Sequence, residues 1–273
     1  MRISTIGVLV AAVMTLAACG GSELGTDRGL SPDSAILQIR SEGGFTTPEA
    51  NLGRGPTFTL TADRRLIFEG PVIAIYPGPL LPNYQVARLS ETQVDEILAL
   101  VDRIGLPDME HEIDDSAASN VADATTEVVT YWDDNGVHQY SVYGLGIDPD
   151  PSNAATTATI ELVETLSTAA FGGETETYLP DRVRIIAGVA VVAPDPGFED
   201  VRPWPLEGED PTLWTELQLG FTCTVLGPEV LELFAEATQL TQWLHPVETM
   251  DAPPFSPLAR PLHPGEPDCP STS

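Results

Sequence analysis

The chain has 273 residues, with 41 acidic side chains against 12 basic ones and a formal net charge of −29 at pH 7. Every basic residue is an arginine, and the arginines are scattered along the chain except at Arg64-Arg65. This charge argues against nucleic acid as a ligand, because proteins bind phosphate backbones through clustered lysines and arginines. Anionic lipid headgroups also repel such a surface, so attachment to a membrane has to rest on a covalent lipid.

The amino terminus has the pattern of a bacterial lipoprotein signal. Its apolar run Ile6–Ala18 is too short to span a bilayer, which takes about 20 residues, and it ends in Leu16-Ala17-Ala18-Cys19. This ending predicts that residues 1–18 are a signal peptide and that Cys19 carries the lipid as the first residue of the mature chain. The alternative is an ordinary secretory signal that is cut after Ala18.

We therefore expect the protein on the outer face of the cell membrane, held by acyl chains on Cys19. Residues 19–33 are rich in Gly, Ser and Asp, and they predict a flexible tether. The folded part is expected to form an α+β domain over residues 34–176 and a second α+β subdomain over residues 177–273, either separate from the first or continuous with it.

The first folded segments have the pattern of short strands. Ala35–Arg40 predicts one strand, and Thr57–Leu60 with Leu66–Phe68 predicts a hairpin. Prolines recur among apolar residues in Pro71–Pro82, which indicates an ordered irregular loop. Gln85–Leu89 predicts a further strand.

Ser90–Gly105 carries the clearest helix pattern of the chain. Ser90 and Gln93 can form a capping box, and Gly105 is a typical helix end. Apolar residues recur at helical spacing and predict a face that is buried in the core. The residues of this face are Val94, Ile97, Leu98, Val101 and Ile104.

The middle of the chain predicts an acidic loop, a hairpin and a second helix. The loop is Asp108–Asp123, and the hairpin joins Thr126–Trp132 to Val137–Gly144 through the turn sequence Asp133-Asp134-Asn135-Gly136. The helix is expected over about Ser152–Ala170.

The second half of the chain repeats this order of elements. Asp181–Val192 and Thr215–Val225 predict strands, and a helix is expected from Gly227-Pro228 to about Leu244. Residues 230–240 align with 94–104, which leaves open an internal duplication or the ordinary likeness of two amphipathic helices. Both alternatives give an α+β fold with antiparallel hairpins, in which two to three amphipathic helices pack on one face.

Cys223 and Cys269 are the two cysteines that remain beside Cys19. In an exported protein such a pair is expected to form a disulfide. A cysteine metal site is the alternative, but His263, the nearest histidine, lies six residues before Cys269 across two prolines, outside ligand spacing.

Short motifs are spread over the mature chain: Leu89-Ser90-Glu91, Val121-Ala122-Asp123, Tyr143-Gly144-Leu145-Gly146, Arg202-Pro203-Trp204-Pro205-Leu206, Thr241-Gln242-Trp243 and Arg260-Pro261-Leu262-His263-Pro264-Gly265-Glu266. Together they resemble a family of functionally uncharacterised exported lipoproteins from high-GC Gram-positive bacteria. The resemblance implies an envelope address and an α+β fold, and it supports a disulfide between Cys223 and Cys269. It implies no catalytic residue.

Motifs that assign a reaction are missing from the sequence. It contains no G-x-S-x-G, S-x-x-K, H-E-x-x-H, P-loop or G-x-G-x-x-G pattern. The four histidines, His111, His138, His245 and His263, stand apart. We therefore predict no catalytic, cofactor-binding or metal-ligating residue, and we interpret the acidic residues around His111 as a solvated loop, with Ca²⁺ binding as the alternative.

These observations favour a non-catalytic lipoprotein that displays an acidic domain to another protein of the cell envelope. Trp204 and the Pro71–Pro82 loop are the candidate contact sites, with Trp204 as a packed anchor being the alternative. A small-ligand or cation-binding protein is a second hypothesis, which a cleft between the two halves supports. An enzyme of unrecognised chemistry is the third, and convergence of carboxylates such as Asp123, Asp133 and Asp134 in one desolvated pocket would favour it.

Replacing Cys19 by serine tests the anchor. We expect Cys19→Ser to block both lipid addition and cleavage, because the thiol is the group that is acylated, so the domain is released or stays as a precursor. Labelling cells with a fatty-acid analogue measures this directly. Equal label on the wild type and on Cys19→Ser contradicts the lipoprotein prediction.

Overall fold

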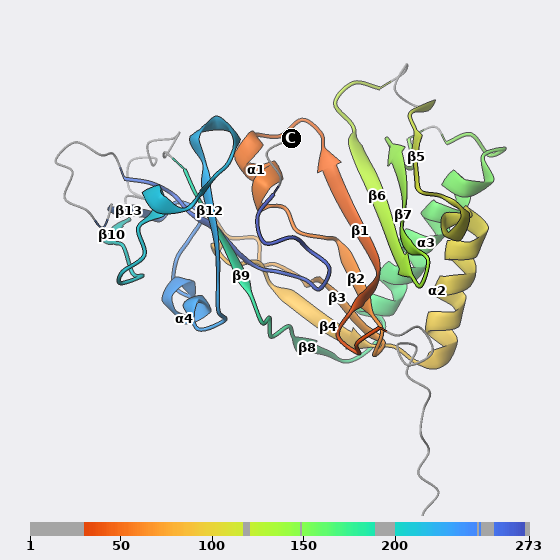
Figure 1. Cartoon of the computed structure of the whole chain (residues 1–273), viewed down its shortest axis with the longest axis horizontal. Coiled ribbons are helices and arrows are strands. Elements are labelled where there is room, and N and C mark those ends of the chain that lie inside the picture. The colour runs from red at the N-terminus through yellow and green to blue at the C-terminus, as the bar shows by residue number, and fades with distance from the viewer. Residues whose placement is uncertain are drawn as a thin grey trace, which may run out of the picture.

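A computed structural model describes residues 30–116, 121–147, 149–188, 200–244, 246 and 254–270. Within these residues the chain has the α+β fold that the sequence predicts, with a large sheet, two long helices on one of its faces and a smaller sheet beside it (Figure 1). No helix in this part of the chain is both long and apolar enough to cross a bilayer.

Eight strands form the large sheet: β1 (Ala35–Gly43), β2 (Phe58–Thr61), β3 (Arg65–Glu69), β4 (Tyr84–Arg88), β5 (His111–Asp114), β6 (Thr125–Asp133), β7 (Gly136–Tyr143) and β8 (Thr175–Thr177). Their order is β5-β7-β6-β1-β2-β3-β4-β8, and all neighbours are antiparallel except β5 and β7. Both predicted hairpins of the first half are confirmed. In the β6–β7 turn, Asp133 Oδ1 accepts hydrogen bonds from the backbone amides of Asn135 and Gly136.

Helices α2 (Glu91–Ile104) and α3 (Ala154–Phe171) cover one face of this sheet (Figure 1). The predicted capping box of α2 is confirmed, because Ser90 Oγ accepts from the Gln93 amide and Gln93 Oε1 accepts from the Ser90 amide. Gly105 ends the helix at φ 86°, a conformation that favours glycine. The buried face differs from the prediction at one position, since Leu100 is buried and Leu98 is half-buried.

The opposite face of the large sheet is also covered. Successive side chains of a strand point to opposite faces, so Leu37 and Ile39 of β1 pack in the core under the helices while Gln38 points to the second face. There Gln38 Nε2 donates to Thr59 Oγ1 at 3.1 Å. The same alternation places Arg40 and Glu42 on the second face.

A second group of elements lies beside the large sheet (Figure 1). It has a four-stranded sheet in the order β11-β12-β9-β14, a two-stranded sheet and two short helices. The elements are α1 (Pro48–Gly53), β9 (Val183–Ala187), β10 (Val201–Pro203), β11 (Thr215–Glu216), β12 (Thr222–Leu226), α4 (Val230–Phe234), β13 (Gln242–Leu244) and β14 (Leu258–Pro261).

Two predictions for elements are wrong in part. The strand expected over Thr215–Val225 is interrupted at Gln218–Gly220, where Leu219 and Gly220 have φ of 60° and 78°. The acidic loop Asp108–Asp123 contains β5, which gains its hydrogen bonds from β7. The strand expected over Asp181–Val192 is confirmed at β9; residues 181, 182 and 188 lie outside the strand, and residues 189–192 lie outside the described part.

The helix expected over residues 227–244 is also wrong, because α4 ends at Phe234. Long-range hydrogen bonds replace the helical ones beyond it: the Leu80 amide donates to Ala237 O at 2.9 Å, and the Gln239 amide donates to Gly78 O at 3.0 Å. Residues 230–240 and 94–104 therefore have different structures, and their alignment gives no support for a duplication.

The carboxyl-terminal segment 262–270 joins the two parts. Tyr178 Oη donates to Leu262 O at 2.8 Å, and Gln38 Nε2 lies 3.4 Å from Pro264 O. Gly265 has φ of 83°, and a Cβ there would come within 3.1 Å of Ala35 Cβ. The segment therefore needs a glycine at the point where it crosses the large sheet. The boundary expected after residue 176 falls inside β8, which pairs with β4.

The predicted disulfide between Cys223 and Cys269 is confirmed. It fixes segment 262–270 to β12, and its two cysteines are separated by 46 residues in the sequence. In the chain-entropy model a loop of this length stabilises the fold by about 4 kcal/mol.

Reducing this disulfide is expected to lower the melting temperature of the mature protein by several degrees, because the unfolded chain regains the entropy of the closed loop. Calorimetry of the oxidised and reduced protein measures the change, and alkylation with mass spectrometry confirms that two thiols are exposed. An unchanged melting temperature after complete reduction contradicts the prediction.

Candidate binding site

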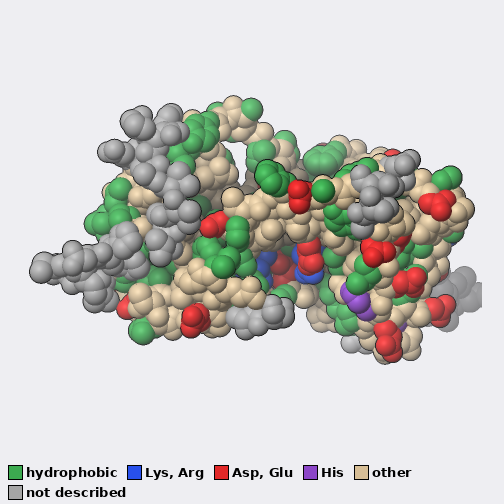
Figure 2. All heavy atoms as spheres, turned by 90° about the horizontal axis from the view of Figure 1, so that it is seen from above, with side chains coloured by type: hydrophobic (Ala, Val, Ile, Leu, Met, Phe, Trp, Pro, Cys, Tyr) green, Lys and Arg blue, Asp and Glu red, His purple; other side chains and the backbone are tan. Residues whose placement is uncertain are grey.

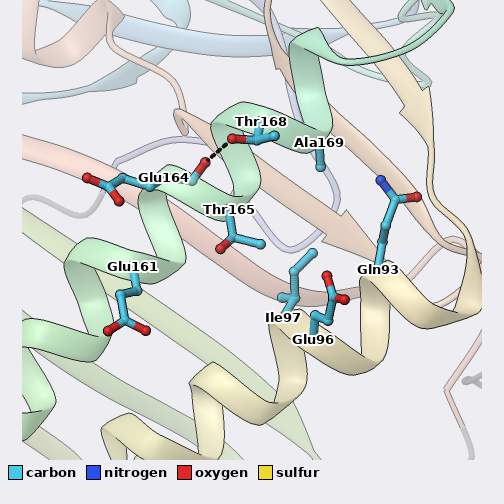
Figure 3. Close-up of a pocket in the computed structure, with 8 residues that line it drawn as sticks. All are labelled: Gln93, Glu96, Ile97, Glu161, Glu164, Thr165, Thr168 and Ala169. Atoms are coloured by element: carbon cyan, nitrogen blue, oxygen red, sulfur yellow. Dashed lines mark hydrogen bonds between the residues drawn. The ribbon is translucent and has the colours of Figure 1, made fainter.

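A groove of about 420 Å³ lies between α2 and α3 on the outer side of the helical layer (Figure 3). It is lined mainly by polar side chains of both helices, together with the apolar side chains of Ile97 and Ala169. Figure 3 shows Glu164 pointing away from Gln93 and Ile97, and Glu161 is engaged by Arg103 in an exposed ion pair at 2.5 Å. Because its carboxylates do not converge, we regard this groove as the surface between two packed helices.

A second pocket, of about 390 Å³, lies between the two sheets. We call it the arginine pocket. Its walls come from β1, α1, β9, β14 and segment 262–270, and Figure 2 shows that the basic side chains of the face in view gather in the hollow between the two parts. The lining residues are Arg40, Ser41, Glu42, Gly43, Asn51, Leu52, Arg54, Arg184, Arg260, Glu266, Pro267 and Pro270.

Two arginines of the pocket lie directly opposite each other on neighbouring strands. Arg184 of β9 pairs in register with Arg260 of β14, and both side chains are only 5% exposed. Like charges at such a position destabilise a sheet. A compensating group is therefore required.

Glu266 supplies this compensation. Its carboxylate, 4% exposed, accepts hydrogen bonds from Arg260 Nη1 at 2.9 Å and from Arg260 Nη2 at 2.6 Å, and Arg184 Nη1 lies 3.9 Å from it. Burial alone lowers the pKa of Arg260, but the hydrogen bonds and charge of Glu266 outweigh burial and hold this pKa above its usual value. We call Arg184, Arg260 and Glu266 the buried ion cluster.

The buried ion cluster keeps an excess of positive charge, because it has two guanidinium groups and one carboxylate. Arg184 is otherwise held by backbone carbonyls: its Nε donates to Asp268 O at 2.9 Å and its Nη2 to Pro267 O at 2.5 Å. Burial, and next the positive charge of Arg260, lower the pKa of Arg184 to about 10. Arg184 therefore stays charged near neutral pH.

Two more arginines reach the pocket from the side of the large sheet. Arg54, the residue after α1, donates from Nη1 to the carbonyls of Ser41 and Gly43, both at 3.3 Å. Arg40 pairs with Glu42 at 2.5 Å. Within the described part of the chain, buried Nε atoms of both Arg40 and Arg260 lack a hydrogen-bond acceptor.

His263 lies next to the buried ion cluster and is fully buried. Its Nδ1 is 2.9 Å from Thr59 Oγ1, its backbone amide donates to Glu266 Oε2, and its ring packs edge-on against Tyr84. Burial lowers the pKa of His263 to about 3. The ring is therefore neutral at physiological pH and adds no charge to the pocket.

The acidic residues considered for catalysis lie apart. Asp123 and Asp133 flank opposite ends of β6, which is about 27 Å long, and Asp134 is exposed. Asp133 instead pairs with His138 Nε2 at 3.0 Å, while His138 Nδ1 lies 2.7 Å from Met109 O. The hydrogen bond with Asp133 raises the pKa of His138.

Trp204 packs among aromatic rings of the second part, with the centroid of Phe255 at 5.0 Å and that of Trp214 at 5.9 Å. Its Nε1 donates to Glu209 O at 2.9 Å. This packing supports the anchor interpretation. His111 is an exposed residue of β5, and the described residues contain no group of three or more His, Cys, Asp or Glu side chains placed to hold a metal ion. Cys19 and His245 lie outside the described residues.

Sequence reasoning missed the arginine pocket. One signal was present, because Arg184 stands within Val183-Arg184-Ile185-Ile186, where an arginine on a fully buried strand needs a partner. The identity of that partner depends on tertiary structure. Comparison of the chain with models of known protein families, with curated proteins and with solved structures gave no match.

The buried His263 predicts a specific dependence of stability on pH. The pKa of this histidine is about 6.5 in the unfolded chain and about 3 in the folded one, so between these values only the unfolded chain takes up its proton. Its contribution therefore lowers stability as pH falls, by about 1.4 kcal/mol per pH unit. Denaturant unfolding between pH 7 and 4.5 should show a shallower loss for His263→Gln than for the wild type.

His138→Gln is the matched control, because the raised pKa of His138 has the opposite sign. His138 stabilises the fold below pH 6.5 and this contribution disappears as pH rises through its folded pKa. The control should therefore lose more stability at pH 5 than at pH 8. Parallel pH profiles for His263→Gln and the wild type contradict the prediction.

Proposed function

We propose that this chain is a lipid-anchored, non-catalytic binding protein of the cell envelope, and that its ligand is a small anion held in the arginine pocket. The acyl chains on Cys19 would fix it to the outer face of the membrane. The proposal combines the predicted lipoprotein signal with the small-ligand hypothesis, which a cleft between the two halves supports. The pocket between the sheets is such a cleft.

The concentration of positive charge in this pocket carries the proposal. Four arginines line the pocket against two carboxylates, in a chain that has 12 basic residues and a net charge of −29. A third of the basic residues of the chain therefore line this one hollow. The buried cluster within it lacks a full counter-charge, and carboxylate and phosphate groups match guanidinium geometry through paired hydrogen bonds.

The size and chemistry of the pocket favour binding over catalysis. Its volume of about 390 Å³ lies in the usual range of small-molecule sites, about 300–1,000 Å³. A guanidinium group offers hydrogen-bond donors and no acceptor, so these arginines can orient and neutralise an anion. Ser41, the only hydroxyl residue of the described lining, donates from Oγ to Glu127 at 2.5 Å.

Titration with small anions tests this function. The detergent-solubilised mature protein is titrated with inorganic phosphate and separately with citrate, and binding is followed by calorimetry and by melting temperature. We expect at least one probe to raise the melting temperature, because a ligand at 100 times its Kd adds about 2.7 kcal/mol of stability. Arg40→Gln and Arg54→Gln should each weaken binding by about 10- to 100-fold, the cost of about 1.5–3 kcal/mol for a lost charged hydrogen bond.

Arg103→Gln is the matched control, because Arg103 pairs with Glu161 on the outer helical face and does not line the pocket. It should bind the probes like the wild type. Equal weakening by Arg103→Gln would show that the anions respond only to overall charge. That result, or no binding of either probe by a folded wild type, overturns the proposal.

A further inference from the structure

A second unusual surface lies on the loop between β3 and β4. Residues 70–83 contain no charged side chain, although the chain as a whole has 41 acidic residues. Every residue of Pro71–Tyr76 is exposed, and the large side chains among them are Val72, Ile73, Ile75 and Tyr76. We call Pro71–Tyr76 the apolar loop. Contiguous apolar exposure of this kind marks a contact surface rather than ordinary scatter.

The base of the apolar loop is held firmly. The Gly70 amide donates to Asn83 O at 2.7 Å, and Asn83 Nδ2 donates to Pro71 O at 2.8 Å. Beyond the loop, Leu80 and Leu81 pack against the core of the second part. The exposed side chains therefore belong to a segment whose two ends are held by the fold.

We propose that the apolar loop rests in the surface of the bilayer to which the lipid on Cys19 ties the domain. This inference rests on the proposed anchor. Leu30 packs against the core and Pro32 O accepts from the Asp63 amide, so only residues 20–29 separate Cys19 from the fold, and they span at most about 40 Å. An anchored domain therefore stays next to the bilayer and meets it at a high effective concentration. Insertion of an uncharged loop removes apolar surface from water and desolvates no charge.

Charge argues against a second copy of this chain as the occupant. Two domains that each carry close to −29 would have to approach each other over an uncharged patch of only a few residues. A neutral bilayer needs no complementary charge, and where headgroups are anionic the covalent lipid holds the acidic domain against their repulsion. The predicted lipidation also places every molecule next to a bilayer.

A tryptophan placed in the apolar loop tests the proposal. Mature lipidated chain is reconstituted in neutral phosphatidylcholine vesicles with brominated acyl chains, which quench a tryptophan that enters the apolar layer. Ile73→Trp is compared with Ile113→Trp as matched control, since these isoleucines are 71% and 60% exposed and Ile113 lies on β5, at the opposite end of the large sheet from β4. The signal of the unsubstituted protein is subtracted.

We expect bromine to reduce the added fluorescence at least twofold for Ile73→Trp and to leave that of Ile113→Trp unchanged. Adding Ile75→Asp to Ile73→Trp should abolish the quenching without changing the circular dichroism spectrum. If the protein binds the vesicles but the fluorescence of Ile73→Trp is not quenched, this inference is overturned and the anchor stands. The result would then favour a protein partner as the occupant of the loop. Equal quenching at both positions also overturns the inference, and failure of the chain to float with vesicles overturns both the inference and the anchor.

Discussion

The carboxylate of Glu266 is the contact on which the joining of the two sheets depends. β9 and β14 place Arg184 and Arg260 opposite each other, an arrangement that like charges would disfavour. Glu266 lies between the two guanidinium groups, and its oxygen also accepts from the His263 amide. The same carboxylate therefore offsets part of the positive charge of one sheet and shapes the segment that crosses the other. Removing one partner of such a buried ion pair strongly destabilises the fold, because the other charge is left buried without compensation.

The sequence predicted the elements whose signals are local. Ser90 and Gln93 lie three residues apart, and the Asp133 carboxylate closes its turn by accepting from the amides of Asn135 and Gly136, so neither element needs the rest of the fold. The choice between Leu98 and Leu100 is different. At 100° per residue they flank the helical stripe about equally, and only the packing of α2 against its neighbours decides which flank is buried.

Tertiary contacts explain why the other predictions failed. Residues after Phe234 have a helical pattern, but the Ala237 carbonyl accepts from Leu80, more than 150 positions earlier in the chain. Local sequence patterns predict the candidate site even less well than these elements, because its four arginines come from both halves of the chain. Each of these arginines has an unremarkable neighbourhood in sequence, apart from Arg184 in its apolar strand. Arg184 and Arg260 meet through the pairing of β9 with β14, and segment 262–270 brings Glu266 to them and lies beside β1.

An anion site inside so acidic a protein is physically consistent, because charges act over short distances in salt. The Debye length is about 8 Å at physiological ionic strength, so acidic side chains further away than this on the surface contribute little at the pocket. The buried guanidinium groups are screened much less, since solvent and ions are excluded around them. A small anion that enters would respond mainly to the local excess of arginine. A large polyanion must stay outside, where it meets the acidic surface first, so this charge distribution selects for ligand size as well as for ligand charge.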